Sequence, residues 1–282
     1  MNPVLRRDMK GKAVERLQRA LLDCGFRPGA TDGRFGPATE AALLAFQRAH
    51  GLLPDGVVGP ITWAKLLGDG AALPADVTGR IDIELVSAMF PYTRLDSIAL
   101  HLPGVLEALR RFSLIDKPMV LMALATIRAE SETFEPVDEL PSRFNTSPGG
   151  HPFDLYDRRA DLGNRGRPDG DRYKGRGFVQ LTGRSNYRRI GHMIGVGDAL
   201  ERSPERAGSP VEAARVLAAF LAGRRRPIKE ALLDADLARA RRLVNGGRHG
   251  IDRFAEAYRI GDGRIRDEVW QTLVVPGRYA AA

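Results

Sequence analysis

The segment Met119-Val-Leu-Met-Ala-Leu-Ala-Thr-Ile-Arg-Ala-Glu-Ser-Glu-Thr-Phe134 begins apolar and ends acidic. Eight of its first nine residues are apolar, which predicts a helix buried on most sides. Asp116 followed by Pro118 is typical of the start of such a helix. Two interpretations are open. Glu130 and Glu132 are solvated residues just beyond a core helix, or Glu130 lies in apolar surroundings at the negative end of the helix dipole. Both features of the second interpretation would raise the pKa of Glu130, which a proton donor near neutral pH requires.

The composition of the chain is that of a soluble globular protein. Its 282 residues are 43% apolar and 28% charged, enough for one large domain or two ordinary ones. No apolar run approaches the ~20 residues of a membrane span, so we expect no stable membrane insertion. The first ten residues lack the apolar region of a secretory signal, which indicates synthesis in the cytoplasm without a signal peptide. Cys24 is the only cysteine, which excludes a disulfide within the chain and a thiolate metal cluster. We expect neither a metal nor a cofactor.

The net charge of +8 favours a polyanionic partner. The densest basic spots are Arg224-Arg-Arg226 and Arg241-Arg242. No aromatic-rich strand or nucleic-acid motif accompanies them, so we expect a solvated basic face and no nucleic acid. An anionic cell envelope suits the same charge.

An eight-residue motif occurs twice near the amino terminus. Asp32-Gly-Arg-Phe-Gly-Pro-Ala-Thr39 recurs 23 positions later as Asp55-Gly-Val-Val-Gly-Pro-Ile-Thr62. The Asp-Gly pairs predict turns, and each Pro suits the first turn of a helix. Apolar residues at helical spacing precede the first copy and lie between the two copies. Residues 1–67 are therefore predicted to be a small helical module in which one turn and helix start is built twice.

This module closely resembles the three-helix peptidoglycan-binding domain over its whole length. The resemblance is carried by the two motif copies together with Gly11, Val14, Leu17, Gln18, Leu21, Gly25, Phe46, Gln47, Gly51, Leu52, Trp63 and Leu66. It implies binding to bacterial peptidoglycan, with the Asp-Gly loops near the polymer. Asp32, Asp55 and Trp63 are the candidate wall-binding residues, although the aspartates could only shape turns and Trp63 could be a core residue.

The rest of the chain is predicted to be a short joint and a larger domain. Residues 68–80 are rich in Gly, Ala and Pro and have no periodic pattern, which predicts a linker. Residues 81–282 contain several segments with helical periodicity, so the whole protein is predicted to be mainly α. Only Lys174–Thr182 has the composition of a strand and loop, and its glycines allow a close approach of the backbone.

Three motifs in the larger domain resemble those of glycoside hydrolase family 19, the chitinases and related phage and bacterial lysozymes. The first is Gly175-Arg-Gly-Phe-Val-Gln-Leu-Thr-Gly-Arg-Ser-Asn-Tyr187. The second is Asn245-Gly-Gly247 followed by Asp252-Arg253, and the third is Ala129-Glu-Ser131. The resemblance implies a lysozyme-like, mostly helical (α+β) catalytic domain over residues 81–282.

The same resemblance implies roles for individual residues. Glu130 would be the general acid, Thr182 would hold the attacking water, and Glu139 would be the base, with Asp138 as the alternative. The family inverts the anomeric carbon, which requires two carboxylates ~6.5–9.5 Å apart. The remaining candidates would bind and orient the sugar: Gln180, Asn186, Tyr187, Arg176, Asn245 and Arg253.

The chain departs from the family pattern in two places. Ala129 occupies the position of the usual histidine, and Glu132 and Thr133 replace glycines. Glu132 is therefore an alternative acid or a charged neighbour of Glu130. Residues 143–173 correspond to nothing in the plant enzymes, and a loop of this length is usually functional or disordered. We expect it to cap the substrate groove.

The leading hypothesis is a monomeric, inverting peptidoglycan glycosidase of the lysozyme type. The absence of a signal favours a phage or prophage endolysin that reaches the periplasm and cell wall through holin pores and causes cytolysis. An injected antibacterial toxin is the alternative setting. A chitinase, a lytic transglycosylase and a non-catalytic wall-binding protein are the alternative functions.

Overall fold

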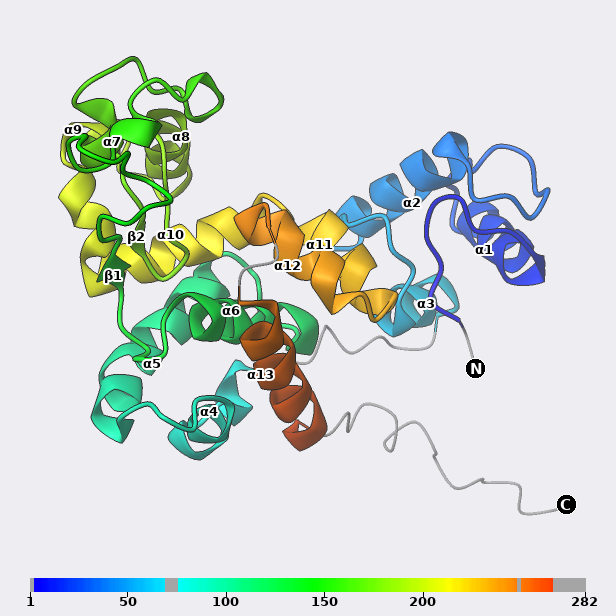
Figure 1. Ribbon diagram of the computed structural model, residues 1–282. Coiled ribbons are helices and arrows are strands. Elements are labelled where there is room, and N and C mark those ends of the chain that lie inside the picture. Colours follow the sequence, from blue (N-terminus) through cyan, green and yellow to red (C-terminus); the bar gives the residue numbers. More distant parts are fainter. Residues whose placement is uncertain (1–2, 69–75, 248–249, 266–282) are drawn as a thin grey trace, which may run out of the picture. The chain divides into compact units, whose positions relative to one another are not determined.

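The structure is a computed structural model that describes residues 3–68, 76–247 and 250–265. The chain divides into two compact units, Met1–Asp76 and Val77–Ala282 (Figure 1). The predicted linker falls partly on residues 69–75, which lie outside the described residues. The predicted mainly helical architecture is confirmed for both units.

The described residues of the first unit form three helices, α1 (Lys12–Asp23), α2 (Pro37–Ala49) and α3 (Pro60–Leu66). Both α2 and α3 begin at the proline of a motif copy, directly after Gly36 or Gly59 in extended conformation. Proline suits this position because its missing N–H would be unpaired in the first turn of any helix. The apolar faces of the helices meet in one core that includes Leu17, Phe46 and Trp63.

The second unit has many more elements around one larger core. In chain order they are η1 (Thr78–Arg80), α4 (Ile83–Met89), α5 (Leu95–Arg111), α6 (Lys117–Glu130), β1 (Val137–Asp138), η2 (Asp154–Tyr156), η3 (Ala160–Leu162), α7 (Asp169–Arg172), β2 (Arg176–Gly177), α8 (Arg184–Met193), α9 (Ala199–Arg202), η4 (Pro204–Gly208), α10 (Pro210–Ala222), α11 (Arg225–Leu233), α12 (Leu237–Asn245) and α13 (Ile251–Arg264). None of the described helices is both long and apolar enough to cross a membrane.

Helix α6 is the central element of the second unit. Every residue from Met119 to Ala129 is buried, because α4, α10, α11 and α13 pack around the helix (Figure 1). The Asp116 side chain accepts a hydrogen bond from the Met119 N–H at 3.1 Å, so the predicted start of the helix is confirmed. The helix ends at Glu130, where the apolar pattern of the sequence ends.

The described residues contain a single pair of strands, β1 and β2. They are antiparallel, with Val137 opposite Gly177 and Asp138 opposite Arg176. The strand predicted in Lys174–Thr182 is therefore present, and its partner lies directly after the α6 segment. This pairing brings residues 137–139 to the glycine-rich motif.

Two segments differ from the simplest interpretation of the sequence. Val77 donates its N–H to the Ile115 carbonyl at 3.0 Å, and Thr78 accepts from Arg110 Nε at 2.8 Å. Residues 77–80 therefore fold with the second unit. Residues 143–173 form short helical turns that are hydrogen-bonded among themselves, including η2, η3 and α7.

Candidate functional site

Glu130 forms an ion pair with a buried arginine. Its Oε1 accepts from Arg241 Nη2 at 2.8 Å, and the Arg241 side chain is fully buried between α6 and its neighbours. The prediction that Arg241 belongs to a solvated basic face is wrong, because the residue lies on the inner face of α12. Leu237, Ala240, Arg241 and Val244 recur at helical spacing, and this pattern could have placed Arg241 inside.

Arg224–Arg226 are not a solvated face either. All three are half-buried, and the Arg224 guanidinium lies 3.9 Å from the centroid of the Phe220 ring. Burial lowers the pKa of Arg224, and the charge of Arg189 lowers it further. Arg225 donates to the Phe112 carbonyl. These basic residues therefore take part in packing within the second unit.

Glu132 is exposed and paired with two arginines. Its Oε1 lies 2.9 Å from Arg253 Nη1 and 3.1 Å from Arg128 Nη1. Hydrogen bonds from Arg253 and Arg128 lower the pKa of Glu132. A carboxyl group whose pKa is lowered is a poor proton donor near neutral pH. Glu130 is paired with an arginine as well, so pairing alone does not separate the two residues. They differ in burial, because the Glu130 side chain is 11% exposed at the end of α6 and that of Glu132 is 49% exposed, and the enclosed position keeps Glu130 as the candidate acid.

Ala129 is tightly enclosed by the start of α13. A Cβ atom at Gly250 would lie 2.8 Å from the Ala129 carbonyl oxygen and 3.2 Å from its Cβ. Arg253 Nη2 donates to the same carbonyl at 3.2 Å. Ala129 itself is fully buried. A histidine here would require the Gly250 backbone to move.

Glu139 is held by three hydrogen-bond donors. Its Oε1 accepts from Asn145 Nδ2 and the Tyr156 hydroxyl, both at 2.9 Å, and its Oε2 accepts from the Gly175 N–H at 2.9 Å. All three partners donate, which fits an ionised carboxylate because that group can only accept. Burial and the hydrogen bond to Glu139 raise the pKa of Tyr156 to about 12, so this hydroxyl stays a donor. Asn145 and Tyr156 are not among the predicted site residues, since both lie in residues 143–173, which match no known motif.

Three polar side-chain atoms converge on Gly175. A Cβ atom at this glycine would lie 2.6 Å from Gln180 Oε1, 3.0 Å from Glu139 Oε2 and 3.3 Å from Thr182 Oγ1. Thr182 Oγ1 donates to the Gln180 carbonyl at 2.9 Å, so its lone pairs stay available to a further donor. The absence of a side chain at Gly175 is what allows these groups to approach each other.

Gln180 adopts a conformation that is unusual for a residue with a side chain. Its φ is 50°, in the left-handed region, which costs of order 1–3 kcal/mol for a residue other than glycine. Its Nε2 donates to the Val137 carbonyl at 2.8 Å and the Gly177 carbonyl at 3.2 Å, across the strand pair. Strain of this kind clusters at functional sites and supports Gln180 as a site candidate.

Arg176 and Tyr187 are turned into the interior. Tyr187 is fully buried and donates its hydroxyl proton to the Lys174 carbonyl at 2.8 Å, while Arg176 Nη1 donates to the Tyr187 oxygen at 3.0 Å. Burial raises the pKa of Tyr187. The prediction that these two side chains bind substrate is wrong for this conformation. Both are buried, and their hydrogen bonds go to each other and to the backbone of residues 172–174.

The remaining sugar-binding candidates lie in different places. Asn186 Nδ2 donates to the Thr182 carbonyl at 2.8 Å, which ties it to the Gly175 group. Asn245 is half-buried at the end of α12 and accepts from the Gly247 N–H at 3.0 Å. The candidates therefore fall into two groups, one around Gly175 and β1 and one around the ends of α6 and α12.

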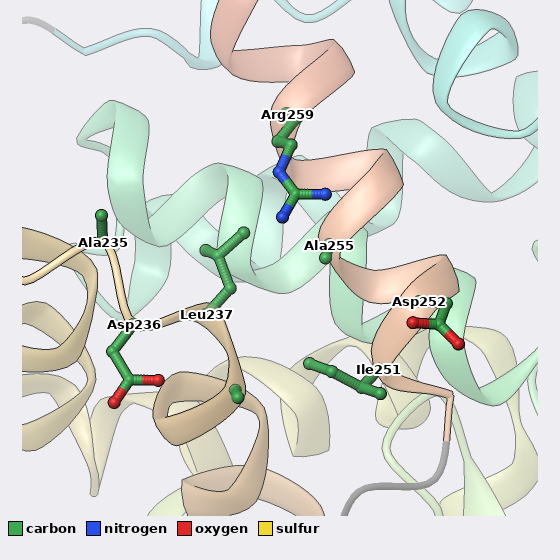
Figure 2. A pocket seen from close by; sticks show the side chains of 8 residues that line it. Ala235, Asp236, Leu237, Ile251, Asp252, Ala255 and Arg259 are labelled. Atoms are coloured by element: carbon green, nitrogen blue, oxygen red, sulfur yellow. The ribbon is translucent and has the colours of Figure 1, made fainter.

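A hollow of about 380 Å³ lies between the start of α12 and the first half of α13 (Figure 2). Leu237 lines it from α12, and Ile251, Asp252 and Arg259 line it from α13. None of the predicted site residues lines this hollow. Nowhere in the described ranges do three or more His, Cys, Asp or Glu side chains come together in a way that could hold a metal ion.

The two motif copies of the first unit form the same hydrogen-bond network twice. Gln18 Nε2 donates to Asp32 Oδ1 at 3.1 Å and its Oε1 accepts from the Gly33 N–H at 2.9 Å. Gln47 makes the equivalent bonds to Asp55 and Gly56, both at 3.0 Å. The aspartates thus shape the turns, which is the alternative that the sequence left open.

Trp63 is part of the core of the first unit. Its side chain is 1% exposed and its Nε1 donates to the Pro3 carbonyl at 2.7 Å. The prediction that Trp63 contacts the wall polymer is wrong for this conformation, because no face of the ring reaches the surface.

Parts of the chain are similar to known proteins. The chain is 44% identical over 75 residues to the zinc D-Ala-D-Ala carboxypeptidase of Streptomyces albus G, covering 24% of this chain and 28% of that protein. It is 46% identical over 56 residues to the N-acetylmuramoyl-L-alanine amidase CwlM of Mycobacterium tuberculosis, covering 20% and 14%. The chain therefore spans less than a third of either relative.

Among solved structures, the chain is similar to chitinase C from Streptomyces griseus HUT6037. The identity is 20%, the TM-score is 0.46, and the match covers 68% of this chain and 79% of that one. A family model described as "Putative peptidoglycan binding domain" matches residues 10–66. The amino-terminal unit therefore carries a domain of this family.

Proposed function

We propose that the second unit hydrolyses the glycan strand of bacterial peptidoglycan by an inverting acid–base mechanism, while the first unit holds the enzyme on the wall. The observation that carries the proposal is the convergence of Glu139, Gln180 and Thr182 on Gly175. A carboxylate fixed by three donors next to a hydroxyl with free lone pairs is suited to binding and activating a water molecule.

In the proposed reaction, the water donates one O–H to Glu139 Oε2 and the other to Thr182 Oγ1. An oxygen lone pair then attacks the anomeric carbon, and Glu139 takes a proton as the new C–O bond forms. Glu130 gives its proton to the glycosidic oxygen as the old bond breaks. The product is a new reducing end with inverted configuration.

The contact with Arg241 assists the acid step in this proposal, in which Glu130 carries a proton before the reaction and its Oε1 accepts from Arg241 Nη2. Glu130 becomes a carboxylate when its proton leaves, and the buried guanidinium 2.8 Å from Oε1 stabilises that developing charge. Arg241 also fixes the carboxyl group at the end of α6, so the proton is delivered from one position.

The first unit supports the choice of substrate. Its family match names peptidoglycan as the ligand, and the net charge of +8 carried by the whole chain suits the anionic envelope that surrounds the polymer. The setting that fits best is a monomeric endolysin that acts on the wall from the periplasm.

Substitution of the two glutamates tests the mechanism. Glu130→Gln and Glu139→Gln should each abolish the release of reducing ends from purified peptidoglycan, while the protein still sediments with the wall. Glu132→Gln is the matched control and should retain activity. Full activity of Glu130→Gln would overturn the proposal.

Product analysis tests the reaction type. Mass spectrometry of the released muropeptides should show the mass of added water, whereas an anhydro product would indicate a transglycosylase. Chitin oligosaccharides provide the comparison substrate. Faster turnover of chitin than of peptidoglycan would assign the protein as a chitinase.

A further inference from the structure

Three exposed hydrophobic residues lie in backbone segments that are tied together near Glu139, because Leu155 donates its N–H to the Asn145 carbonyl at 3.3 Å and the Leu140 carbonyl accepts from Asn145 Nδ2 at 2.9 Å. Leu140 is 77% exposed and Phe144 is 75% exposed, although both are large hydrophobic residues. Leu155, which precedes the Tyr156 partner of Glu139, is 46% exposed. Single exposed hydrophobics are ordinary, but a group of them beside a polar site indicates a surface that is covered during function.

The turn that carries these side chains is held in place by Asn145. This residue is 1% exposed, and its Oδ1 accepts from the Ser142 N–H at 2.7 Å. Its Nδ2 donates to the Leu140 carbonyl and to Glu139 Oε1, both at 2.9 Å. The amide that fixes the Glu139 carboxylate therefore also fixes the turn. Leu140 and Phe144 are therefore exposed on a turn whose backbone is held by hydrogen bonds to Asn145.

A cation accompanies the exposed aromatic ring. The Arg143 guanidinium lies 4.9 Å from the centroid of Phe144, and Arg143 is exposed. Within the described part of the chain it pairs with no carboxylate. The turn therefore offers an exposed aromatic ring with a cation over it that no carboxylate in the described part of the chain neutralises.

We propose that Leu140, Arg143 and Phe144 form a substrate platform for a sugar next to the bond that is cleaved, with specificity for an anionic glycan. Phe144 takes the apolar face of a sugar ring, and Arg143 takes a carboxylate carried by the glycan. This inference rests on the proposed function and names its specificity element. Peptidoglycan carries carboxylates on its muramic acid peptides, whereas chitin is neutral, so the platform selects between the two.

The chain provides a matched control for the exposure argument. Tyr92 is 83% exposed and Leu100 is 73% exposed, but they lie beside α4 and in α5 and have no hydrogen-bond connection to Glu139. If exposure of a large hydrophobic side chain were sufficient for glycan binding, substitution at these positions would have the same effect as substitution at Phe144.

The test compares Phe144→Ala, Arg143→Gln and Tyr92→Ala in the full-length protein on soluble peptidoglycan fragments and on a chitin oligosaccharide. Phe144→Ala should raise KM about tenfold on both glycans with little change in kcat. Arg143→Gln should raise KM on the peptidoglycan fragments alone, and added salt should reduce the difference from wild type. Tyr92→Ala should leave both constants unchanged.

Titration of each glycan into the Glu130→Gln background measures the same platform without turnover. Equal affinity of the Phe144→Ala and Tyr92→Ala proteins would overturn the platform, and an equal loss on both glycans in Arg143→Gln would overturn the charge selection. Failure of the proposed hydrolysis gives a different result, namely a wild-type protein that binds glycan and releases no reducing ends.

Discussion

The two units of this chain use hydrogen-bonded carboxylates for different ends. In the first unit, Asp32 and Asp55 each accept from a glutamine of the same small repeat and from a backbone N–H two residues further on. In the second unit, Glu139 accepts from donors as far away as Gly175, and its Oε2 lies beside Thr182 and Gln180. All three carboxylates accept several hydrogen bonds, so the number of hydrogen bonds does not distinguish them. Glu139 differs because its Oε2 lies beside other polar side-chain atoms, which makes it the candidate base.

The largest expected effect is on Glu139. Glu139→Gln should lower kcat on peptidoglycan by about 100-fold or more, because general base catalysis contributes ~10²–10⁴-fold. The measurement is reducing-end release, with thermal unfolding as the check on the fold. Asp138→Asn is the matched control, since Asp138 is exposed and lies 3.5 Å from Arg176 Nε. The assignment is reversed if Asp138→Asn is the inactive variant.

The next effect concerns the partner of Glu130. Arg241→Ala leaves a largely buried carboxylate without its cation, which should cost about 3 kcal/mol of unfolding free energy. Chemical denaturation of the full-length protein measures this loss. Arg242→Ala changes the adjacent exposed arginine and should have little effect. Equal stability of the two variants would show that the ion pair contributes nothing to the fold.

A smaller effect is expected in the first unit, where the two repeats can be compared with each other. Gln18→Ala and Gln47→Ala each leave a buried Gly N–H without its partner and remove one of the donors to an aspartate, which should cost about 2 kcal/mol. Hydrogen exchange at Gly33 and Gly56 should report each loss separately. Turnover of a small soluble glycan by the second unit should not change, and a loss of that turnover would contradict the independence of the two units.

The smallest effect is a dependence of stability on pH in the second unit. Burial raises the pKa of Asp169, but the hydrogen bonds from Arg184 and from the Arg165 N–H, together with the charges of both arginines, outweigh burial, so the net shift is downward. Hydrogen bonds from Arg188 and then Arg184 likewise lower the pKa of Glu201. The folded-state pKa values are depressed, so this stabilisation is present above the unfolded pKa, near 4, and is lost as pH falls through the folded values.

Arg184→Gln tests this pH dependence. The variant should be less stable than wild type at neutral pH, and the difference should shrink on acidification below pH 4. Thermal unfolding as a function of pH measures it. A difference that stays constant down to the acid transition would contradict the proposed linkage.

The parts of the fold that the sequence predicts are those specified locally. Helix α6 follows from its apolar run and the Asp116 cap, and the repeated turns follow from two copies of one motif. Both depend on residues close together in the chain. Their identification needed no knowledge of what packs against them.

The parts of the site that the sequence did not predict depend on contacts between distant segments. Asn145 and Tyr156 donate hydrogen bonds to Glu139 from a segment without periodicity, so no local sequence pattern predicts these contacts. Spacing also does not tell which way a side chain turns in a short element. Tyr187 recurs with the buried Ile190 and Ile194 at helical spacing, which was a signal for the interior, whereas Trp63 lies in a helix of only seven residues.

The contact between Ala129 and Gly250 has a consequence for how such chains can diverge. A side chain at Gly250, the residue before α13, would meet the Ala129 carbonyl oxygen at 2.8 Å and the Ala129 Cβ at 3.2 Å, so the two positions are in direct contact. Substitutions at the two positions are therefore coupled, and neither can be accepted alone without disturbing the residue that precedes Glu130. Among homologous sequences, the identity of residue 129 should covary with the length and glycine content of the segment before α13.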